Sequence, residues 1–270
     1  MVVAQLDAYR RLSDETRARV AAAVTVAFTR LGRVDDEALE TFVRIVVPQV
    51  LAGQLRLSAL TDAYLAAVTA EVLGGPPVPV GVPADAIDYR QLRNGTPPEI
   101  VYTRPMITAR KALKDGADIG QALQVGAARL DGTVQADLQL AERRAAHEVV
   151  RADDRISGFR RVLRPAASKS GSCGLCLAAS SQRYGKEDLL PIHNRCHCAV
   201  MPIFGRRDEG LRVNQERYQE ASRLARDEGQ RGAATRRQLA NVRVRDHGEL
   251  GPVLTKRGDR FTGPGEAQAG

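Results

Sequence analysis

The sequence predicts a mostly α-helical protein with a small α+β part. Hydrophobic residues make up 43% of the 270 residues but aromatic residues only 4%, and there is no Trp, so the core should be aliphatic. Apolar residues recur at three- and four-residue steps, which places them on one face of a helix. All four cysteines fall within residues 172–202. We expect an N-terminal helical bundle, a Pro-rich strap, and then helices leading to a short-stranded Cys/His metal-knot segment.

Residues 1–73 are expected to form the helical N-terminal region. The apolar face of the first helix comprises Leu6, Tyr9, Ser13, Thr16, Val20, Val24, Ala27 and Leu31. Gly32 should end this helix, and Asp35 and Asp36 suit the start of the next one because carboxylates there complement the helix dipole. Pro48 should kink or split the second helix. Such faces predict a packed bundle or, alternatively, a surface that docks another subunit.

Residues 74–96 form a Pro/Gly-rich linker or strap, which begins GGPPVPVGVP. Its prolines favour an extended, semi-rigid chain. Thr96 then suits a helix cap, with prolines in the first turn. Residues 134–156 are the longest helical stretch, after a turn at Asp131 and Gly132. His147 is expected on the surface of that helix, since no second histidine completes a metalloprotease motif.

A basic strip precedes the cysteines. It comprises Arg151, Arg155, Arg160, Arg161, Arg164 and Lys169. Asp153 and Asp154 are the only acidic residues in this strip, so its own net charge is half of the chain's formal net charge of +8. Such a strip could bind DNA phosphates or an acidic protein, or it could be a solvated face. Apolar and basic residues alternate in residues 158–164 well enough to predict a short strand within the strip.

The cysteines form two hooks. Cys173 and Cys176 make a C-x-x-C pair and, after 19 residues, Cys196 and Cys198 make a C-x-C pair, with His193 three residues before it. This spacing fits a structural zinc site, so zinc is the predicted cofactor and these five residues are its candidate ligands. His197 is a weaker candidate, because an extended backbone would point it away from both neighbours.

Other readings of the hooks remain open. They could form disulfides, if the protein ends in a virion outside the reducing cytosol, or one thiol could pair with a histidine as a nucleophile. A DNA-reading zinc finger fits less well, because the segment between the hooks, residues 177–195, lacks the H-x-x-x-H half. The N-terminus lacks a signal-peptide pattern and no apolar run could span a membrane. A cytosolic location follows, and there clustered thiols favour a metal.

Several blocks resemble the phage Mu F-type minor head proteins, most closely those of actinobacterial tailed phages. They are GFRRVLRP from Gly158, SCGLC from Ser172, QRY from Gln182, LLPIHNRCHC from Leu189 and HGELGPVL from His247. The likeness is densest over residues 158–202. It implies a head-morphogenesis domain over residues 97–261, with the Cys/His knot at 172–202. We expect residues 262–270 to be a disordered tail.

The resemblance implies a minor capsid or head-morphogenesis protein, made in the host cytoplasm and placed in the virion, inside the head or near the portal vertex. Its partners would be portal, scaffold or major capsid protein, with possible non-specific contact to packaged DNA. No membrane or small-molecule substrate is expected. The alternative is a capsid maturation protease, a label that members of this branch often carry. The sequence has no H-E-x-x-H, G-x-S-x-G or P-loop motif, so we expect binding rather than catalysis.

Overall fold

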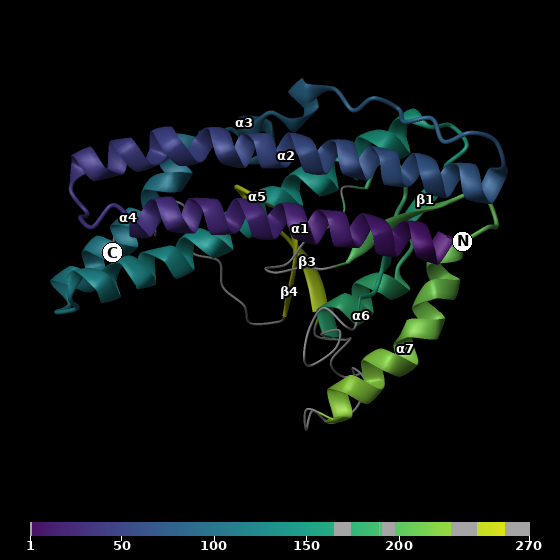
Figure 1. The fold of residues 1–270 in the computed structure, drawn as a ribbon. Coiled ribbons are helices and arrows are strands. Elements are labelled where there is room, and N and C mark those ends of the chain that lie inside the picture. The colour runs from purple at the N-terminus through teal and green to yellow at the C-terminus, as the bar shows by residue number, and fades with distance from the viewer. Residues whose placement is uncertain (1, 165–173, 189, 191–197, 228–241, 257–270) are drawn as a thin grey trace.

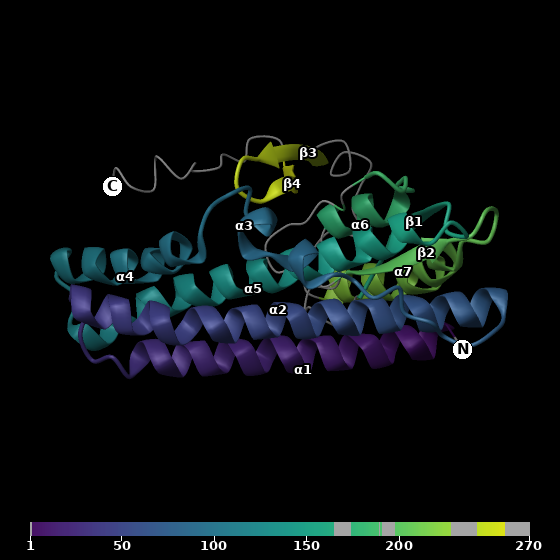
Figure 2. The same ribbon diagram turned by 90° about the horizontal axis from the view of Figure 1, so that it is seen from above.

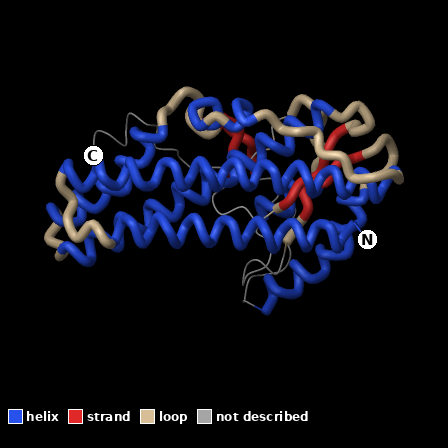
Figure 3. Tube along the Cα trace, turned by 45° about the horizontal axis from the view of Figure 1, so that its top comes forward, coloured by secondary structure: helices blue, strands red, loops and turns tan. Residues whose placement is uncertain are grey.

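The computed structural model describes residues 2–164, 174–188, 190, 198–227 and 242–256. Over these residues the protein is mostly helical, with two small antiparallel sheets of two strands each, which confirms the predicted fold class. The predicted tail at 262–270 lies outside the described residues. Figure 3 shows the short strands lying between and beside much longer helices.

Four helices form the body of the molecule. They are α1 (Val2–Thr29), α2 (Asp36–Leu73), α4 (Pro98–Lys114) and α5 (Ile119–Ala152). Figures 1 and 2 show α1 and α2 side by side as an antiparallel pair, with α5 packed along them and α4 at one end. One apolar core is built from all four helices, including Phe28, Phe42, Tyr102 and Leu138. Residues 1–73 therefore share their core with the later helices.

Helix α2 begins as predicted but is not divided at Pro48. The Asp35 carboxylate accepts a hydrogen bond from the Ala38 backbone N–H at 2.8 Å, which caps the helix start. Pro48 removes one backbone donor. Val46 and Val50, on either side of it, are fully buried in the core. We attribute the continuity of the helix to this packing, which outweighs one lost hydrogen bond.

Two other expected boundaries are wrong. Helix α5 passes through Asp131 and Gly132 without a turn, because Leu130 and Val134 on either side are buried in the same core. Its N-cap is instead Asp118. The Asp118 carboxylate accepts a hydrogen bond from the Gln121 backbone N–H, and the Gln121 side-chain oxygen accepts one from the Asp118 backbone N–H. Thr96 does not cap α4, since Pro97 occupies that position without a side-chain hydrogen bond.

The Pro-rich segment that follows α2 runs back along this helix (Figure 1). Residues 76–83 adopt no helix or strand. The carboxylate of Asp62, on α2, accepts hydrogen bonds from the backbone N–H groups of Val80, Gly81 and Val82 at 2.9, 2.8 and 3.3 Å. One buried carboxylate thus fixes the segment to the helix. The short helices η1 (Ala84–Ile87) and α3 (Tyr89–Leu92) follow.

The second part of the chain adds the strands. It comprises β1 (Gly158–Val162), α6 (Gly174–Ser181), β2 (Ala199–Ile203), α7 (Glu209–Asp227), β3 (Val242–His247) and β4 (Gly251–Lys256). Strand β1 pairs antiparallel with β2, from Gly158 opposite Ile203 to Val162 opposite Ala199. The predicted strand in the basic strip is therefore confirmed. Phe159 and Met201 share a second apolar core with Leu6 and Tyr64 of the long helices.

Candidate metal centre

One cysteine of each hook, Cys176 and Cys198, lies at the same end of the first sheet. Because Val162 lies opposite Ala199, the next residues outward, Leu163 and Cys198, leave the sheet at the same end. Cys176, in the first turns of α6, is 8% exposed and forms a small apolar cluster with Leu163 and Leu177. Cys198 packs against this cluster. One thiol from each hook is therefore held at the same place.

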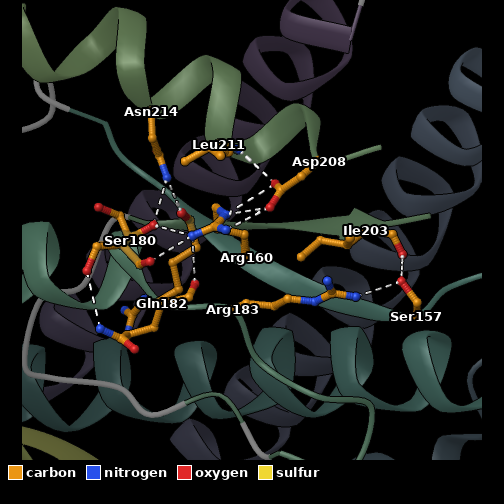
Figure 4. Close-up of polar contacts among 11 residues, drawn as sticks. Ser157, Arg160, Ser180, Gln182, Arg183, Ile203, Asp208, Leu211 and Asn214 are labelled. Atoms are coloured by element: carbon orange, nitrogen blue, oxygen red, sulfur yellow. Dashed lines mark hydrogen bonds and ion pairs between the residues drawn. The ribbon is translucent and has the colours of Figure 1, made fainter. Parts of the chain in front are cut away.

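Arg160 holds the helix that carries Cys176 (Figure 4). From β1 it donates hydrogen bonds through Nη1 to the backbone carbonyls of Ser180, Ser181 and Gln182 at 3.2, 2.9 and 3.0 Å. These carbonyls lie at the C-terminal end of α6, where the helix leaves acceptors unpaired and a positive charge is favourable. The arginine therefore caps α6 and fixes it to the sheet.

The same guanidinium also holds α7. Arg160 donates through Nε and Nη2 to the carboxylate of Asp208, at 2.9 and 2.7 Å. Asp208 in turn accepts a hydrogen bond from the Leu211 backbone N–H at 2.8 Å, which caps the start of α7. Figure 4 shows Arg160 between Asp208 and the end of α6. A single buried side chain thus ties β1, α6 and α7 together.

Asn214 on α7 makes a second connection. Its side-chain amide donates to the carbonyls of Arg161 and Ser180 at 2.8 and 3.2 Å, and its oxygen accepts from the Leu163 N–H at 2.8 Å. Leu163, the residue directly after β1, belongs to the same apolar cluster as Cys176 and Leu177. The polar contacts of Asn214 therefore position the apolar cluster beside the thiols.

Tyr184, of the QRY block, pairs with β1. The rings of Phe159 and Tyr184 stack with centroids 5.3 Å apart, and their backbones exchange two hydrogen bonds of 2.9 Å. Gly158 has φ +157°, and a Cβ at that position would lie 2.5 Å from the Tyr184 carbonyl oxygen. A glycine at this place is thus required by the close approach of the segment that follows α6.

The predicted ligand set is only partly within the described residues. Cys176 and Cys198 are described, whereas Cys173, His193 and Cys196 lie outside the described ranges. The described parts of the chain contain no group of three or more His, Cys, Asp or Glu residues arranged to hold a metal. Two converging thiols fit zinc, which prefers thiolate ligands. They fit a disulfide-linked pair of hooks as well, so the zinc site stays a prediction.

The six basic residues do not form one continuous surface. Arg160 is 6% exposed and Arg161 is fully buried, so both act inside the protein. Arg151 lies 3.5 Å from Glu187, and the Arg155 side chain is 58% exposed and bonded to Asp153 at 2.8 Å. The hydrogen bonds from Arg155 lower the pKa of Asp153. Arg164 pairs with Asp14 on α1, and Lys169 lies outside the described residues. Only Arg151 and Arg155 are therefore well placed for an external anion.

His147 is buried, contrary to the prediction of a surface histidine. It is 8% exposed and lies against Phe159, Leu190 and Val200, because the sheet packs onto this part of α5. Neither ring nitrogen has a hydrogen-bond partner of normal geometry among the described residues. Burial, and to a lesser extent the charge of nearby arginines, lowers the pKa of His147. The sequence did not show that a strand would cover this face.

A buried polar cluster around Asp137 was not predicted. The Asp137 carboxylate on α5 accepts hydrogen bonds from the hydroxyls of Tyr89 and Tyr102 at 2.7 and 2.6 Å, and from Arg93 Nε at 2.6 Å. Burial, followed by the nearby Asp137 charge, raises the pKa of both tyrosines. An acid between the buried Val134 and Leu138 was the signal in the sequence, but its partners are far away along the chain.

The Asp137 cluster extends to the C-terminal hairpin. Glu249, between β3 and β4, lies 2.9 Å from Arg104 on α4 and 3.5 Å from Arg93. Arg143 on α5 also donates to the carbonyls of Leu250 and Pro252 at 2.8 and 3.1 Å. The HGELGPVL block thus attaches the hairpin to the helices. Its turn is at residues 248–250, and Gly251 and Pro252 belong to β4.

Comparison with known proteins gives no match: no family model fits the chain, and neither a curated protein nor a solved structure is similar to it. In the described parts of the chain, none of the helices combines the length and the apolar character needed to cross a membrane. The site must therefore be interpreted from its own residues.

Proposed function

We propose that this chain is a minor head protein of a tailed phage that acts near the portal, in procapsid assembly or in DNA packaging and ejection. The proposal rests on the Cys/His block of the sequence. The observation that carries it furthest is that Cys176 and Cys198, one from each hook, share one apolar cluster. A metal knot requires the two hooks to lie close together, and the placement of these two cysteines supports that arrangement. The partners would be portal, scaffold or major capsid protein.

The proposed cofactor is one zinc ion. Cys173, Cys176 and Cys196 would be ligands, with either His193 or Cys198 as the fourth. A closed set of four such ligands has a structural role, and its binding energy contributes directly to folding. In this chain it would join the start of α6 to the start of β2, at the end of the sheet opposite Gly158.

The proposed mode of action is binding rather than catalysis. The polar side chains described near the thiols are used to connect structural elements: Arg160 and Asp208 bond each other, and Asn214 bonds three backbone groups. A protease would need a nucleophile within hydrogen-bond reach of a base. His147, the buried histidine, makes no such contact with a described residue. These features support an assembly role.

Co-expression tests the proposal. The full chain would be produced with the portal, scaffold and coat proteins that we expect the same genome to encode, and particles would be separated on a gradient. We expect the chain to sediment with procapsids. Cys176→Ser should abolish this association, because it removes a ligand of the proposed knot. Ser181→Ala is the matched control on the same helix, since Ser181 is exposed and its hydroxyl bonds only to its neighbours, the Ala178 carbonyl and the Gln182 side chain.

The same experiment separates the alternatives. If the chain stays at the top of the gradient while procapsids form normally without it, the head-protein proposal is wrong. Loss of coat-protein cleavage with intact particles, in a variant that retains its zinc, would instead favour the protease. Binding of the chain to DNA alone should weaken steeply with salt if phosphate contacts dominate.

A further inference from the structure

A polar cavity lies between the long helices and β2. It encloses about 430 Å³ of space free of atoms, part of it continuous with solvent. Its wall is formed by α1, α2, α5, β1 and the start of β2, and it includes Tyr9, Tyr64, Glu142, Arg143, Arg161 and Cys198. The cavity is thus on the helix-facing side of the strand that Cys198 precedes.

The charged side chains of the wall are mostly positive. Three arginines line the cavity, Arg17, Arg143 and Arg161, with Glu142 as the single carboxylate among the described lining residues. Glu142 already pairs with Arg17. Arg143 is 5% exposed, and its two terminal nitrogens donate hydrogen bonds to neutral backbone carbonyls. Arg143 therefore brings a positive charge to the wall that its own contacts do not neutralise.

Donors in this wall that have no acceptor among the described residues include one on Arg143 and one on Tyr64. These two are Nε of Arg143 and the hydroxyl of Tyr64, each with less than 1 Å² of accessible surface. The neighbouring Tyr9, which stacks on Tyr64 at 4.4 Å, does have a partner, because its hydroxyl is 3.0 Å from the Thr61 hydroxyl. Burial and the nearby Arg144 and Arg161 lower the pKa of Arg143 to about 10, so it is still charged at neutral pH. A buried donor without an acceptor destabilises the folded protein. A negatively charged acceptor would both accept these hydrogen bonds and balance the positive charge of Arg143.

We propose that this cavity binds a compact oxyanion of the phosphate or sulfate class, held by Arg143 and the Tyr64 hydroxyl. Both donor atoms are closed to bulk solvent. Because the donor atoms are buried, we favour a free tetrahedral anion over a phosphate of a nucleic-acid backbone, which carries two bulky ester substituents. The inference does not depend on the proposed function, because it uses none of the proposed zinc ligands as a contact.

Thermal unfolding of the full chain tests the proposal. Far-UV circular dichroism would record the midpoint in increasing sodium phosphate or sulfate, against sodium chloride at the same ionic strength and pH. A ligand that binds only the folded state raises the midpoint with its concentration. We expect phosphate and sulfate to raise it beyond chloride. Tyr64→Phe should weaken the apparent affinity about three- to tenfold, the usual value of one hydrogen bond. Arg143→Gln should weaken it at least as much.

Controls make the outcomes distinct. Arg144→Gln removes a neighbouring charge on α5 that does not line the cavity, and it should respond to the anions like the natural chain. If Arg143→Gln does not fold, Tyr64→Phe decides alone, because it loses no internal hydrogen bond among the described residues. Equal responses to phosphate and chloride, or an undiminished phosphate response in Tyr64→Phe, would overturn the proposal. Protection by a short oligonucleotide but not by inorganic phosphate would also overturn it.

Discussion

The long-helix bundle and the β1–α6–β2–α7 unit are stabilised in different ways. In the bundle, four helices bury a continuous set of apolar side chains, from Phe28 on α1 to Leu138 on α5. In the smaller unit, the described residues of the cluster next to the thiols are Leu163, Cys176 and Leu177, with Cys198 packed against them. Its elements are joined by the polar contacts of Arg160 and Asn214.

This difference indicates which changes each region tolerates. The bundle has a distributed core, so most of its single side chains can be altered without loss of the fold. The end of the smaller unit that carries the thiols depends on a few side chains, and we propose that zinc supplies part of its stability. A substitution in the smaller unit should therefore alter that unit alone, whereas a destabilising substitution in the bundle should lower the stability of the whole protein. The bundle should be least tolerant where it buries charged side chains.

The largest expected effect is that of Asp137→Ala in the bundle. It would leave the buried Arg93 and two tyrosine hydroxyls without their acceptor, which costs about 3–5 kcal/mol when a buried pair is broken. Urea unfolding followed by circular dichroism measures this. Asp115→Ala is the control, because its pair with Lys111 at 3.3 Å is exposed and is worth about 0–1 kcal/mol. Similar losses for both variants would contradict the account.

Arg160→Met should have the next largest effect and should act on the smaller unit. It removes the hydrogen bonds to Asp208 and to the end of α6, for a cost of about 2–3 kcal/mol. We expect most of the helical signal to remain while Cys176 and Cys198 react faster with a thiol reagent. Arg155→Met, which alters an exposed arginine, should leave these rates unchanged. Unfolding of the bundle together with the unit would show that the two regions are not separable.

Two glycines of α5 provide an opposed pair. A Cβ on Gly126 would lie 2.7 Å from the Phe28 ring and 2.8 Å from the Pro105 carbonyl oxygen, so Gly126→Ala should destabilise the bundle by about 1–3 kcal/mol. A Cβ on Gly132 meets nothing within 4 Å. Gly132→Ala should stabilise the helix by about 0.5–1 kcal/mol. Thermal midpoints that move in the same direction for both variants would be inconsistent with this packing.

The smallest expected effect concerns His147, at the contact between the two regions. Its pKa is lowered in the folded state by burial, so the unfolded chain binds a proton at higher pH than the folded protein does. Stability should thus fall as pH drops through about 6.5, the ordinary histidine value, and level off below the folded pKa. His147→Gln should reduce this slope. The check is the unfolding midpoint of both proteins between pH 7.5 and pH 5, and equal slopes would rule out His147 as the cause.

The sequence predicted the features that depend on local pattern. The Asp35 cap and the strand at β1 follow from capping and alternation, and both are confirmed. The predicted face of α1 is confirmed at most positions, but Leu31 lies beyond the end of the helix and the buried Phe28 was not predicted. Pro48, Asp131 and Gly132 misled because buried neighbours override local preference. The burial of His147 and the partners of Asp137 depend on segments far away in sequence, which no local pattern reveals.

The candidate site was predictable to a similar extent. Cysteine spacing indicated that the two hooks belong together, and Cys176 and Cys198 do meet on one apolar cluster. The role of Arg160 was not foreseen: within a basic strip it suggested an external anion, yet it caps α6 and pairs with Asp208. The sequence around one arginine does not distinguish an arginine that binds an external anion from one that forms internal hydrogen bonds.

The most direct test of the proposed knot is metal analysis combined with thiol counting on protein purified under reducing, chelator-free conditions. We expect about one zinc per chain, in keeping with a four-ligand structural site. Chelation should then release the metal and expose all four cysteines to a thiol reagent, while the bundle keeps its helical signal. Protein without metal, in which the cysteines form disulfides and resist the reagent, would contradict the central claim.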